Sequence, residues 1–453
     1  MTFTVLSDDQ IRDTLENLSH DELDEFRNVL ATALHEFSTN PKESYQQPLR
    51  ISTHHPTSRA MSLYMPSCGP EGMGCKIVSL TTSDVTDADP SVKPIPPTGV
   101  VNLFTPTGQP LGLLNASTLT AFRTALASTC LLSRRAHVRT ITVFGAGSQA
   151  YWHVRLALML RGSTIRKVHV VNRRFSDAAG AILRSFSLVD PEIKKREGWE
   201  GAEFSMLTPA FHDYERLLTE NLLASDVIYC CTPSREPVFD GSILTSHDGR
   251  RRGRLVVAVG SFKPDMHELP EELLLQATKP HHGKGHRHFH RHADEGGVVV
   301  VDTLEGALTE SGEIISAKIG ANQLVELGEL VMLDRLPAEE SEDNPLSQTS
   351  TDTLLDSEKP SEPSAAESSS TATSPTTNSG SRFPSLFHKR SSSSASDSDK
   401  KTKKETEDGR SRWLRDGTVV YKSVGLGLMD LVVGNHIVKV ARAKNIGTQI
   451  PGF

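Results

Sequence analysis

The sequence predicts a protein of the α/β class, built around a doubly wound parallel sheet. Two observations support this prediction. A strand, a glycine-rich turn, a helix and a second strand follow one another between residues 141 and 171. Further along, the short apolar runs 226–233 (DVIYCCTP) and 255–260 (LVVAVG) have the length and composition of buried strands. Strands that alternate with helices are typical of a parallel sheet with helices on both faces.

The chain before this region predicts a separate domain over residues 1–133. Residues 7–38 are helical by spacing, with Ser7 as the N-cap and two aspartates in the first turn, where carboxylates stabilise a helix N-terminus. Apolar runs divided by proline and glycine follow, such as 99–104, and we expect these to be strands.

The glycine-rich turn has the sequence Gly145-Ala146-Gly147-Ser148-Gln149-Ala150, which is the pattern G-x-G-x-x-A. Gly145 would form the tight turn, Gly147 would let a pyrophosphate approach the backbone, and Ala150 would allow close packing of the helix, whose N-terminus favours phosphate. The glycines alone are a weak signal and could form a plain turn. Because the strand, the helix and the second strand (167–171) all lie where the pattern requires, we predict a Rossmann-type dinucleotide-binding domain over residues 134–336.

The residues after the second strand indicate which dinucleotide binds. An NAD-binding chain usually places Asp or Glu there, whereas this chain has Asn172, Arg173 and Arg174. Two guanidinium groups suit a 2′-phosphate, so NADPH is predicted over NADH; alternatively, the arginines only cap a surface turn. Thr232 and Gly260 end the next two strands, and we expect both to face the nicotinamide half.

Two segments are predicted to be insertions. Residues 337–411 are rich in Ser, Thr, Pro, Glu and Lys, a composition typical of disorder. They interrupt one domain, because 321–336 is helical by spacing and an ordered pattern resumes at Thr418. Residues 279–292 hold six histidines, which could bind Zn or Ni, but interleaved Arg and Lys and the lack of Cys or carboxylates favour a mobile surface loop.

Composition and charge exclude several classes of protein. The chain has 453 residues, 37% hydrophobic and 23% charged, with no apolar run long enough to span a membrane. Most of the net charge of −7 lies in the serine-rich segment, so the remainder gives no electrostatic case for binding nucleic acid. Five cysteines without disulfide or metal-ligand spacing, and an acidic N-terminus unlike a secretory signal, predict a cytoplasmic protein with reduced thiols.

Seven stretches of the sequence resemble the ornithine cyclodeaminase and mu-crystallin family, which includes ketimine reductases and an alanine dehydrogenase. They are residues 48–50, 65–66, 74–78, 108–123, 145–150, 259–269 and 420–430. The resemblance implies a homodimer. It also implies that each subunit combines a Rossmann domain with an α+β substrate and dimerisation domain, formed by residues 1–133 and completed by the C-terminal segment 412–453.

The resemblance also implies a substrate site. In such proteins two arginines and a lysine hold the carboxylate of an amino or imino acid, and they match Arg50, Arg123 and Lys76. Guanidinium groups bind carboxylates well, and a lysine beside the reacting carbon can donate a proton, so Lys76 is the predicted catalytic residue. Each could instead be a surface charge, although Lys76 lies within an apolar run. Ser423 and Gly425 match a family loop near the nicotinamide.

Two departures from the family pattern bear on the reaction. Ornithine cyclodeaminases carry an aspartate where this chain has Phe262, and a glutamate where it has Leu63. Their loss removes a general base and the partner of an ornithine amine. We therefore expect NAD(P)H-dependent reduction of a small cyclic ketimine carboxylate of the proline or pipecolate type, with Phe262 as an apolar wall against the ring. Ornithine cyclodeamination with recycled NAD, and non-enzymatic NADPH binding as in mu-crystallin-like proteins, are the alternatives.

Overall fold

The computed structural model of the chain describes residues 2–40, 44–81, 95–279, 296–333 and 409–453, together with 85–86, 89 and 91–93. The predicted serine-rich insertion lies outside these residues except for 409–411, which begin a helix that runs to 416. The predicted histidine-rich loop also lies outside them, apart from Lys279. Within the described part of the chain, no helix combines the length and the apolar character needed to span a membrane.

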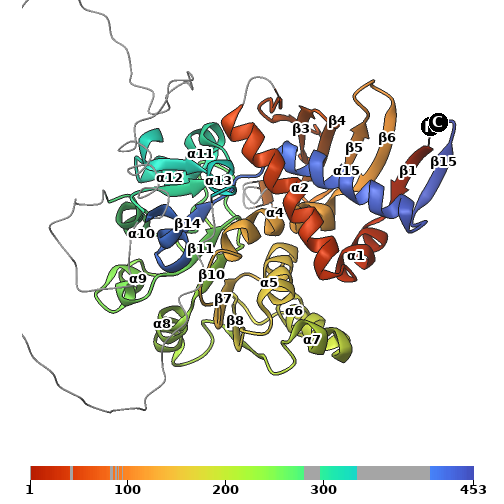
Figure 1. Ribbon diagram of the computed structural model, residues 1–453. Coiled ribbons are helices and arrows are strands. Elements are labelled where there is room, and N and C mark those ends of the chain that lie inside the picture. The colour runs from red at the N-terminus through yellow and green to blue at the C-terminus, as the bar shows by residue number, and fades with distance from the viewer. Residues whose placement is uncertain are drawn as a thin grey trace, which may run out of the picture. The chain divides into compact units, whose positions relative to one another are not determined.

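An eight-stranded sheet forms the predicted α/β core, and all of its strand pairs are parallel (Figure 1). Its order is β13-β12-β14-β11-β10-β7-β8-β9. The strands are β7 (Thr140–Phe144), β8 (Lys167–Val171), β9 (Glu203–Leu207), β10 (Val227–Cys230), β11 (Leu255–Ala258), β12 (Val299–Val301), β13 (Leu324–Glu326) and β14 (Val419–Lys422). Four central strands are buried along their whole length, as expected where helices cover both faces of a parallel sheet.

Short helices connect these strands. They are α5 (Ser148–Arg161), α6 (Asp177–Leu188), α7 (Pro191–Glu197), α8 (Tyr214–Ala224), α9 (Ser242–Thr245), α10 (Glu271–Ala277), α11 (Leu304–Glu310), α12 (Gly312–Ser316) and α13 (Leu327–Leu330). The carboxyl ends of β7, β8, β10, β11, β12 and β14 therefore meet at one edge of the sheet, where ligands bind in doubly wound folds.

A second sheet of seven strands has the order β15-β1-β6-β5-β4-β3-β2. The strands are β1 (Thr2–Leu6), β2 (Ile51–His54), β3 (Met61–Gly69), β4 (Gly72–Leu80), β5 (Thr98–Phe104), β6 (Pro110–Asn115) and β15 (Thr448–Pro451). Three helices contact its strands: α1 (Asp8–Glu16), α4 (Ala116–Leu132) and α15 (Gly427–Ala443). The long helix α2 (His20–Thr39) packs on α4 and α15. Figure 1 shows α2 and α15 side by side along this sheet.

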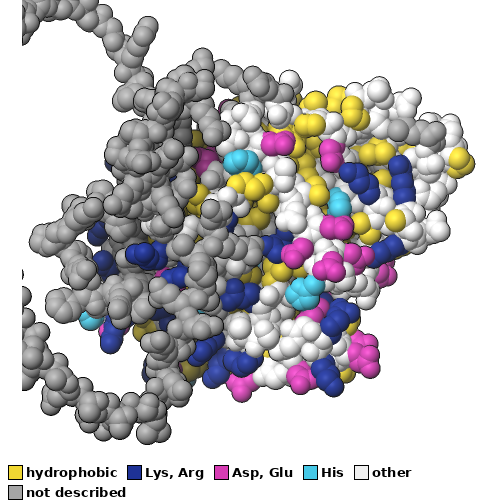
Figure 2. All heavy atoms as spheres, viewed as in Figure 1, with side chains coloured by type: hydrophobic (Ala, Val, Ile, Leu, Met, Phe, Trp, Pro, Cys, Tyr) yellow, Lys and Arg dark blue, Asp and Glu magenta, His cyan; other side chains and the backbone are white. Residues whose placement is uncertain are grey.

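Alternate residues of this second sheet are buried, which identifies its covered face. Met65, Lys76, Val101 and Leu114 lie opposite one another in register on adjacent strands and are all buried. Their neighbours along each strand point to the other face and are only half-buried or exposed. Figure 2 shows acidic and basic side chains interspersed on the side of the molecule that it presents, without a large area of one sign.

The C-terminal segment is divided between the two sheets. It was expected to complete the first domain, but β14 pairs with β11 and β12 in the parallel sheet. Only α15 and β15 join the other sheet, where β15 pairs with β1. The buried, uniformly apolar residues of β14 suit a central parallel strand, so this segment links the two halves of the fold.

Of the two regions predicted to be helical, 7–38 is confirmed and 321–336 is wrong. Residues 7–38 form two helices, because α1 ends at Asn17 and Ser19 begins a second capping box with Glu22. Residues 321–336 do not form one helix. Leu324–Glu326 instead pair with β12 as the edge strand β13, followed by the single turn α13, so pairing with the sheet overrides the helical spacing.

Candidate active site

The glycine-rich turn has the geometry of a phosphate-binding loop. Gly145 has φ +103°, and a Cβ there would lie 2.9 Å from the Cys231 carbonyl oxygen, so this position requires glycine. Gly147 is the N-cap of α5 and makes no side-chain cap bond, while Ala150 is fully buried. A Cβ on Gly147 would meet nothing within 4 Å. Free space therefore lies before the first N–H groups of a 14-residue helix, which fits the pyrophosphate of a dinucleotide.

The other residues of this turn have different surroundings. Ala146 is half-buried and packs against the core, and Ser148 is exposed. The Gln149 Oε1 is buried and has no hydrogen-bond partner in the described structure. A buried acceptor without a donor is an unsatisfied group that a bound ligand could pair.

The predicted cofactor-selecting residues follow β8. The Asn172 side chain donates to the Arg174 carbonyl at 2.7 Å and so closes the turn itself. The Arg173 and Arg174 side chains are exposed, and the described residues give neither of them a hydrogen bond or ion pair. The guanidinium groups are thus not needed to cap the turn and are available to an anion.

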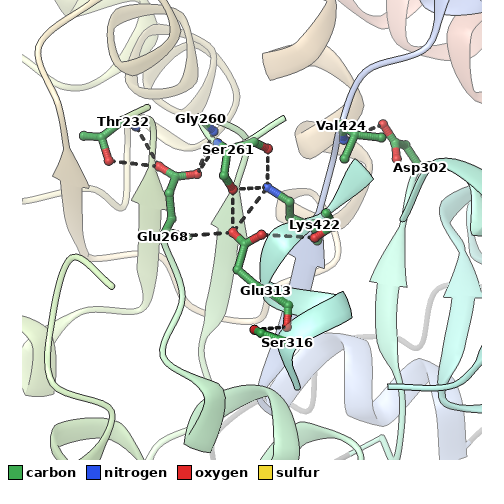
Figure 3. Close-up of polar contacts among 10 residues, drawn as sticks. Thr232, Gly260, Ser261, Glu268, Asp302, Glu313, Ser316, Lys422 and Val424 are labelled. Atoms are coloured by element: carbon green, nitrogen blue, oxygen red, sulfur yellow. Dashed lines mark hydrogen bonds and ion pairs between the residues drawn. The ribbon is translucent and has the colours of Figure 1, made fainter. Parts of the chain in front are cut away.

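A buried carboxylate joins the ends of β10 and β11. Glu268 accepts from the Thr232 and Gly260 backbone N–H groups at 2.6 and 2.7 Å, and from the Ser261 N–H at 3.0 Å (Figure 3). Burial raises the pKa of Glu268, although these donors and Lys422 oppose the shift. Thr232 and Gly260, both predicted to face the nicotinamide, are therefore held in place by the same side chain.

A lysine ties this loop to β14. The Lys422 ammonium donates to the Ser261 carbonyl at 2.6 Å and lies 3.4 Å from the Glu313 carboxylate, and all three residues are buried (Figure 3). Burial alone would raise the pKa of Glu313, but Lys422 and the Ser261 hydroxyl lower it. The network makes the loops after β10, β11 and β14 one rigid unit.

The loop after β14 is fixed by a second buried carboxylate. Asp302 Oδ2 accepts from the Ser423 hydroxyl at 2.7 Å and from the backbone N–H groups of Val424 and Gly425 at 3.0 and 2.7 Å. The Ser423 hydroxyl, predicted to lie near the nicotinamide, donates to Asp302, and its contact with a cofactor stays a prediction. Gly425 has φ +91° and lies against the Arg123 guanidinium, since a Cβ there would be 3.1 Å from Nη2.

The predicted substrate residues meet in one ionic cluster. The Lys76 ammonium, on β4, lies 2.7 Å from Asp430 Oδ2, and the Arg123 Nε, on α4, donates to Asp430 Oδ1 at 3.0 Å. All three side chains are at least 96% buried. Asp430 lies in the first turn of α15, where the helix dipole stabilises a carboxylate.

Arg50 reaches the same cluster from the loop before β2. Its Nη2 forms an ion pair with Glu310, at the end of α11, and donates to the Val424 carbonyl at 3.2 Å. Lys76, Arg123 and Arg50 carry three positive charges against the two negative charges of Asp430 and Glu310. In these ion pairs the cations outnumber the carboxylates three to two, and guanidinium groups are well suited to bind the carboxylate of a ligand.

The surroundings of Lys76 lower its pKa. Burial lowers the pKa of Lys76 to about 8, and the positive charges of Arg123 and Arg50 act in the same direction, whereas Asp430 opposes them. An ammonium with this pKa is protonated at neutral pH and can lose its proton readily, as a general acid requires.

Known proteins share this architecture. Residues 9–195 match the model of the ornithine cyclodeaminase/mu-crystallin family. The chain is therefore similar to the ornithine cyclodeaminase/mu-crystallin family. A delta(1)-pyrroline-2-carboxylate reductase of Bacillus thuringiensis is 28% identical over 69% of this chain and 82% of that protein. The ketimine reductase mu-crystallin of Mus musculus is 26% identical over 67% of this chain and 80% of its own length.

Solved structures agree with the fold. The delta(1)-pyrroline-2-carboxylate reductase of Thermococcus litoralis, in complex with NADH and L-proline, has a TM-score of 0.59 and 21% identity, and the match covers 98% of this chain and 99% of that one. An archaeal alanine dehydrogenase dimer with bound NAD has a TM-score of 0.59 and 18% identity, with full coverage of both chains. At this identity the likeness establishes the α/β fold.

The two positions that depart from the cyclodeaminase pattern are both half-buried. Leu63 lies on β3, in register with Val78, and Phe262 follows Ser261 on the loop after β11. The role of Phe262 as a wall against a substrate ring stays a prediction.

The sequence did not point to several residues that shape this site. Asp430, Glu310, Asp302, Glu268 and Glu313 are carboxylates that each hold a loop or a cation. Two of them had a signal: Asp430 and Glu268 lie in stretches that resemble the family, and Asp430 is a charge within the apolar run GLMDLVV. A charge in a buried apolar helix indicates a buried partner.

Proposed function

We propose that this chain is an NAD(P)H-dependent reductase of small cyclic imino acids, converting a ketimine carboxylate of the proline or pipecolate type into the cyclic amino acid. The observation that carries this proposal is the cluster of Lys76, Arg123 and Arg50, in which the cations outnumber their paired carboxylates and the lysine has a lowered pKa. The names of the bacterial and mouse relatives, a pyrroline-2-carboxylate reductase and a ketimine reductase, support it.

The substrate carboxylate binds to the two arginines. Arg50 uses only Nη2 for Glu310 and Val424, and Arg123 uses Nε and Nη1 for Asp430 and the Met429 sulfur. The Nε and Nη1 donors of Arg50 and the Nη2 of Arg123 thus stay available among the described contacts. Two guanidinium groups fix the orientation of a planar carboxylate, and with it the adjacent C=N bond.

Lys76 supplies the proton. Its ammonium lies beside the arginines that hold the carboxylate, and the pKa of about 8 keeps it protonated at neutral pH. As the imine carbon is reduced, the nitrogen gains electron density and takes the Lys76 proton. A nicotinamide dinucleotide, held by the turn at Gly145–Ala150, would supply the hydride to the imine carbon. The buried surroundings of Lys76 exclude water, which protects a ketimine from hydrolysis.

We propose NADPH as the preferred dinucleotide, with NADH as a weaker one. Arg173 and Arg174 are exposed at the carboxyl end of β8, while Asn172 makes the turn and no carboxylate stands in these three positions to accept from a ribose hydroxyl. A 2′-phosphate can form charge-assisted bonds with both guanidinium groups.

A homodimer is part of the proposal. The seven-stranded sheet carries α15 and α4 on one face. No described helix covers its other face, where half-buried apolar side chains such as Ile77, Val100 and Leu113 lie. An apolar sheet face of this kind is typical of an interface between subunits, and the archaeal alanine dehydrogenase was solved as a dimer.

Ornithine cyclodeamination and non-enzymatic NADPH binding are the competing functions. The apolar residues Leu63 and Phe262 disfavour ornithine cyclodeamination, because neither can activate water or pair with an amine. The test is oxidation of NADPH and NADH by the purified protein with pyrroline-2-carboxylate and piperideine-2-carboxylate, run beside ammonia release from ornithine with NAD. Reduction without ammonia release supports the reductase. Ammonia and proline from ornithine contradict it, and binding of NADPH without either reaction identifies a binding protein.

A further inference from the structure

One short segment of the chain touches all three cations of the cluster. The Val424 carbonyl accepts from Arg50, Gly425 lies against the Arg123 guanidinium, and Asp430 pairs with Lys76 and Arg123. These contacts lie within residues 423–430, which run from the end of β14 into the first turn of α15. The position of this segment therefore determines where the cations stand.

A single carboxylate fixes the start of the segment. Asp302 follows β12, is 99% buried, and receives three hydrogen bonds on Oδ2 from Ser423, Val424 and Gly425. Its Oδ1 accepts from the Thr303 N–H at 3.0 Å. Backbone N–H groups that bind a buried charged acceptor leave the loop little freedom, because no other acceptor can replace it.

Asp302 belongs to the parallel sheet, whereas Arg50, Lys76 and Arg123 come from the half of the chain that builds the other sheet. We propose that Asp302 is a positioning residue for the substrate site. Through the 423–425 loop, it sets where the carboxylate-binding cations stand relative to the dinucleotide turn. The inference rests on the proposed function, since it assigns this position to imino-acid binding.

The proposal predicts that loss of Asp302 affects binding of the two ligands differently. None of the hydrogen bonds of Asp302 among the described residues reaches the Gly145–Ala150 turn, so its loss should weaken binding of a carboxylate much more than binding of a dinucleotide. Asp302→Asn keeps the shape but removes the charge that three donors share. Asp226 offers a matched control: it is also buried and accepts from the Arg139 and Thr140 N–H groups, but it precedes β10, at the opposite edge of the sheet.

The experiment measures binding to the full-length protein by calorimetry, with pyrrole-2-carboxylate as a planar probe that carries one carboxylate, and with NADPH separately. For Asp302→Asn we expect the Kd of the probe to rise about tenfold or more, with the NADPH Kd changed by less than about twofold. Steady-state kinetics should show a raised KM for the imino acid with a smaller change in kcat. Asp226→Asn should leave the Kd of the probe unchanged.

A milder variant covers the case in which Asp302→Asn does not fold. Ser423→Ala removes one of the three bonds and should raise the Kd of the probe in the same direction by a smaller factor. The inference is overturned if Asp302→Asn and Ser423→Ala bind the probe like the wild type, if NADPH binding weakens as much as probe binding, or if Asp226→Asn reproduces the loss. A wild-type protein that binds neither ligand instead overturns the proposed function, and the inference with it.

Discussion

Replacing Asp430 by asparagine tests whether Lys76 is the proton donor and whether the cluster determines its charge. Reduction needs the ammonium form, so kcat/KM should be level below the Lys76 pKa of about 8 and fall tenfold per pH unit above it. Asp430 raises this pKa through an oxygen 2.7 Å from the Lys76 nitrogen. An opposite charge at such a distance shifts a pKa by about 1 to 3 units.

The substitution should therefore move the falling limb of the pH profile to lower pH by about 1 to 3 units, which corresponds to about 1.4 to 4 kcal/mol in the free energy of protonation. Asparagine retains an oxygen that can accept from the Arg123 Nε, so the fold has a replacement for one of the two contacts. At neutral pH most Lys76 side chains of the variant would lack the proton, and kcat/KM should fall accordingly.

The assay is kcat/KM for pyrroline-2-carboxylate with NADPH between pH 5.5 and about 10, measured for the wild type, Asp430→Asn and Asp226→Asn. Titration of the substrate itself is common to all three proteins and cancels in the comparison. Asp226→Asn removes a buried carboxylate elsewhere and should keep the wild-type limb. A limb that stays in place in Asp430→Asn, or moves to higher pH, would refute the assignment of Lys76 as the proton donor.

Three further variants test other parts of the proposal. Lys76→Met should lower kcat by about 10² to 10⁴ while NADPH binding, followed by its fluorescence, stays intact; loss of both would assign Lys76 a structural role. Arg173→Ala with Arg174→Ala should raise the NADPH Kd by about tenfold or more and leave the NADH Kd nearly unchanged, and an equal loss for both would contradict the 2′-phosphate assignment. Val100→Lys, on the uncovered sheet face, should convert a dimer into a monomer in light scattering, and a stable dimer would place the interface elsewhere.

Local patterns predicted the parts of the fold that depend on local chemistry. The strands β7, β8, β10 and β11 were predicted with ends that differ by at most three residues, because strands buried on both faces are continuous apolar runs. The turn at Gly145 was predicted because a positive φ and a close backbone approach restrict that position to glycine. The spacing of apolar residues gave a wrong prediction, a helix, at 324–326. The same residues can line a helix or form a strand, and pairing with the neighbouring β12 makes them a strand.

The site was predictable in its cations and not in its carboxylates. Arg50, Lys76 and Arg123 matched a family pattern, but their partners lie far away in sequence: Glu310 is 260 residues from Arg50, and Asp430 is 307 residues from Arg123. No window of sequence contains both members of such a pair. The same holds for Asp302 and the 423–425 loop, whose contacts exist only because β12 and β14 are adjacent in the sheet.

Phe262 is the position that best distinguishes the reductase hypothesis from the cyclodeaminase hypothesis. Phe262→Asp places a carboxylate next to Ser261, on the loop that Glu268 and Lys422 already hold rigid. Glu268 and Glu313 both bind the adjacent Ser261, so their charges should raise the pKa of the new aspartate while Lys422 opposes them. If the remaining framework supports cyclodeamination, ammonia release from ornithine with NAD should rise about tenfold or more over the wild type, while reduction of pyrroline-2-carboxylate falls.

Phe262→Asn, which is polar but not basic, is the matched control and should not release ammonia. If neither variant releases ammonia although both still bind NADPH and pyrrole-2-carboxylate, the lost carboxylate at Phe262 does not by itself separate the two activities, and the difference must lie elsewhere in the site, with Leu63 the next residue to change.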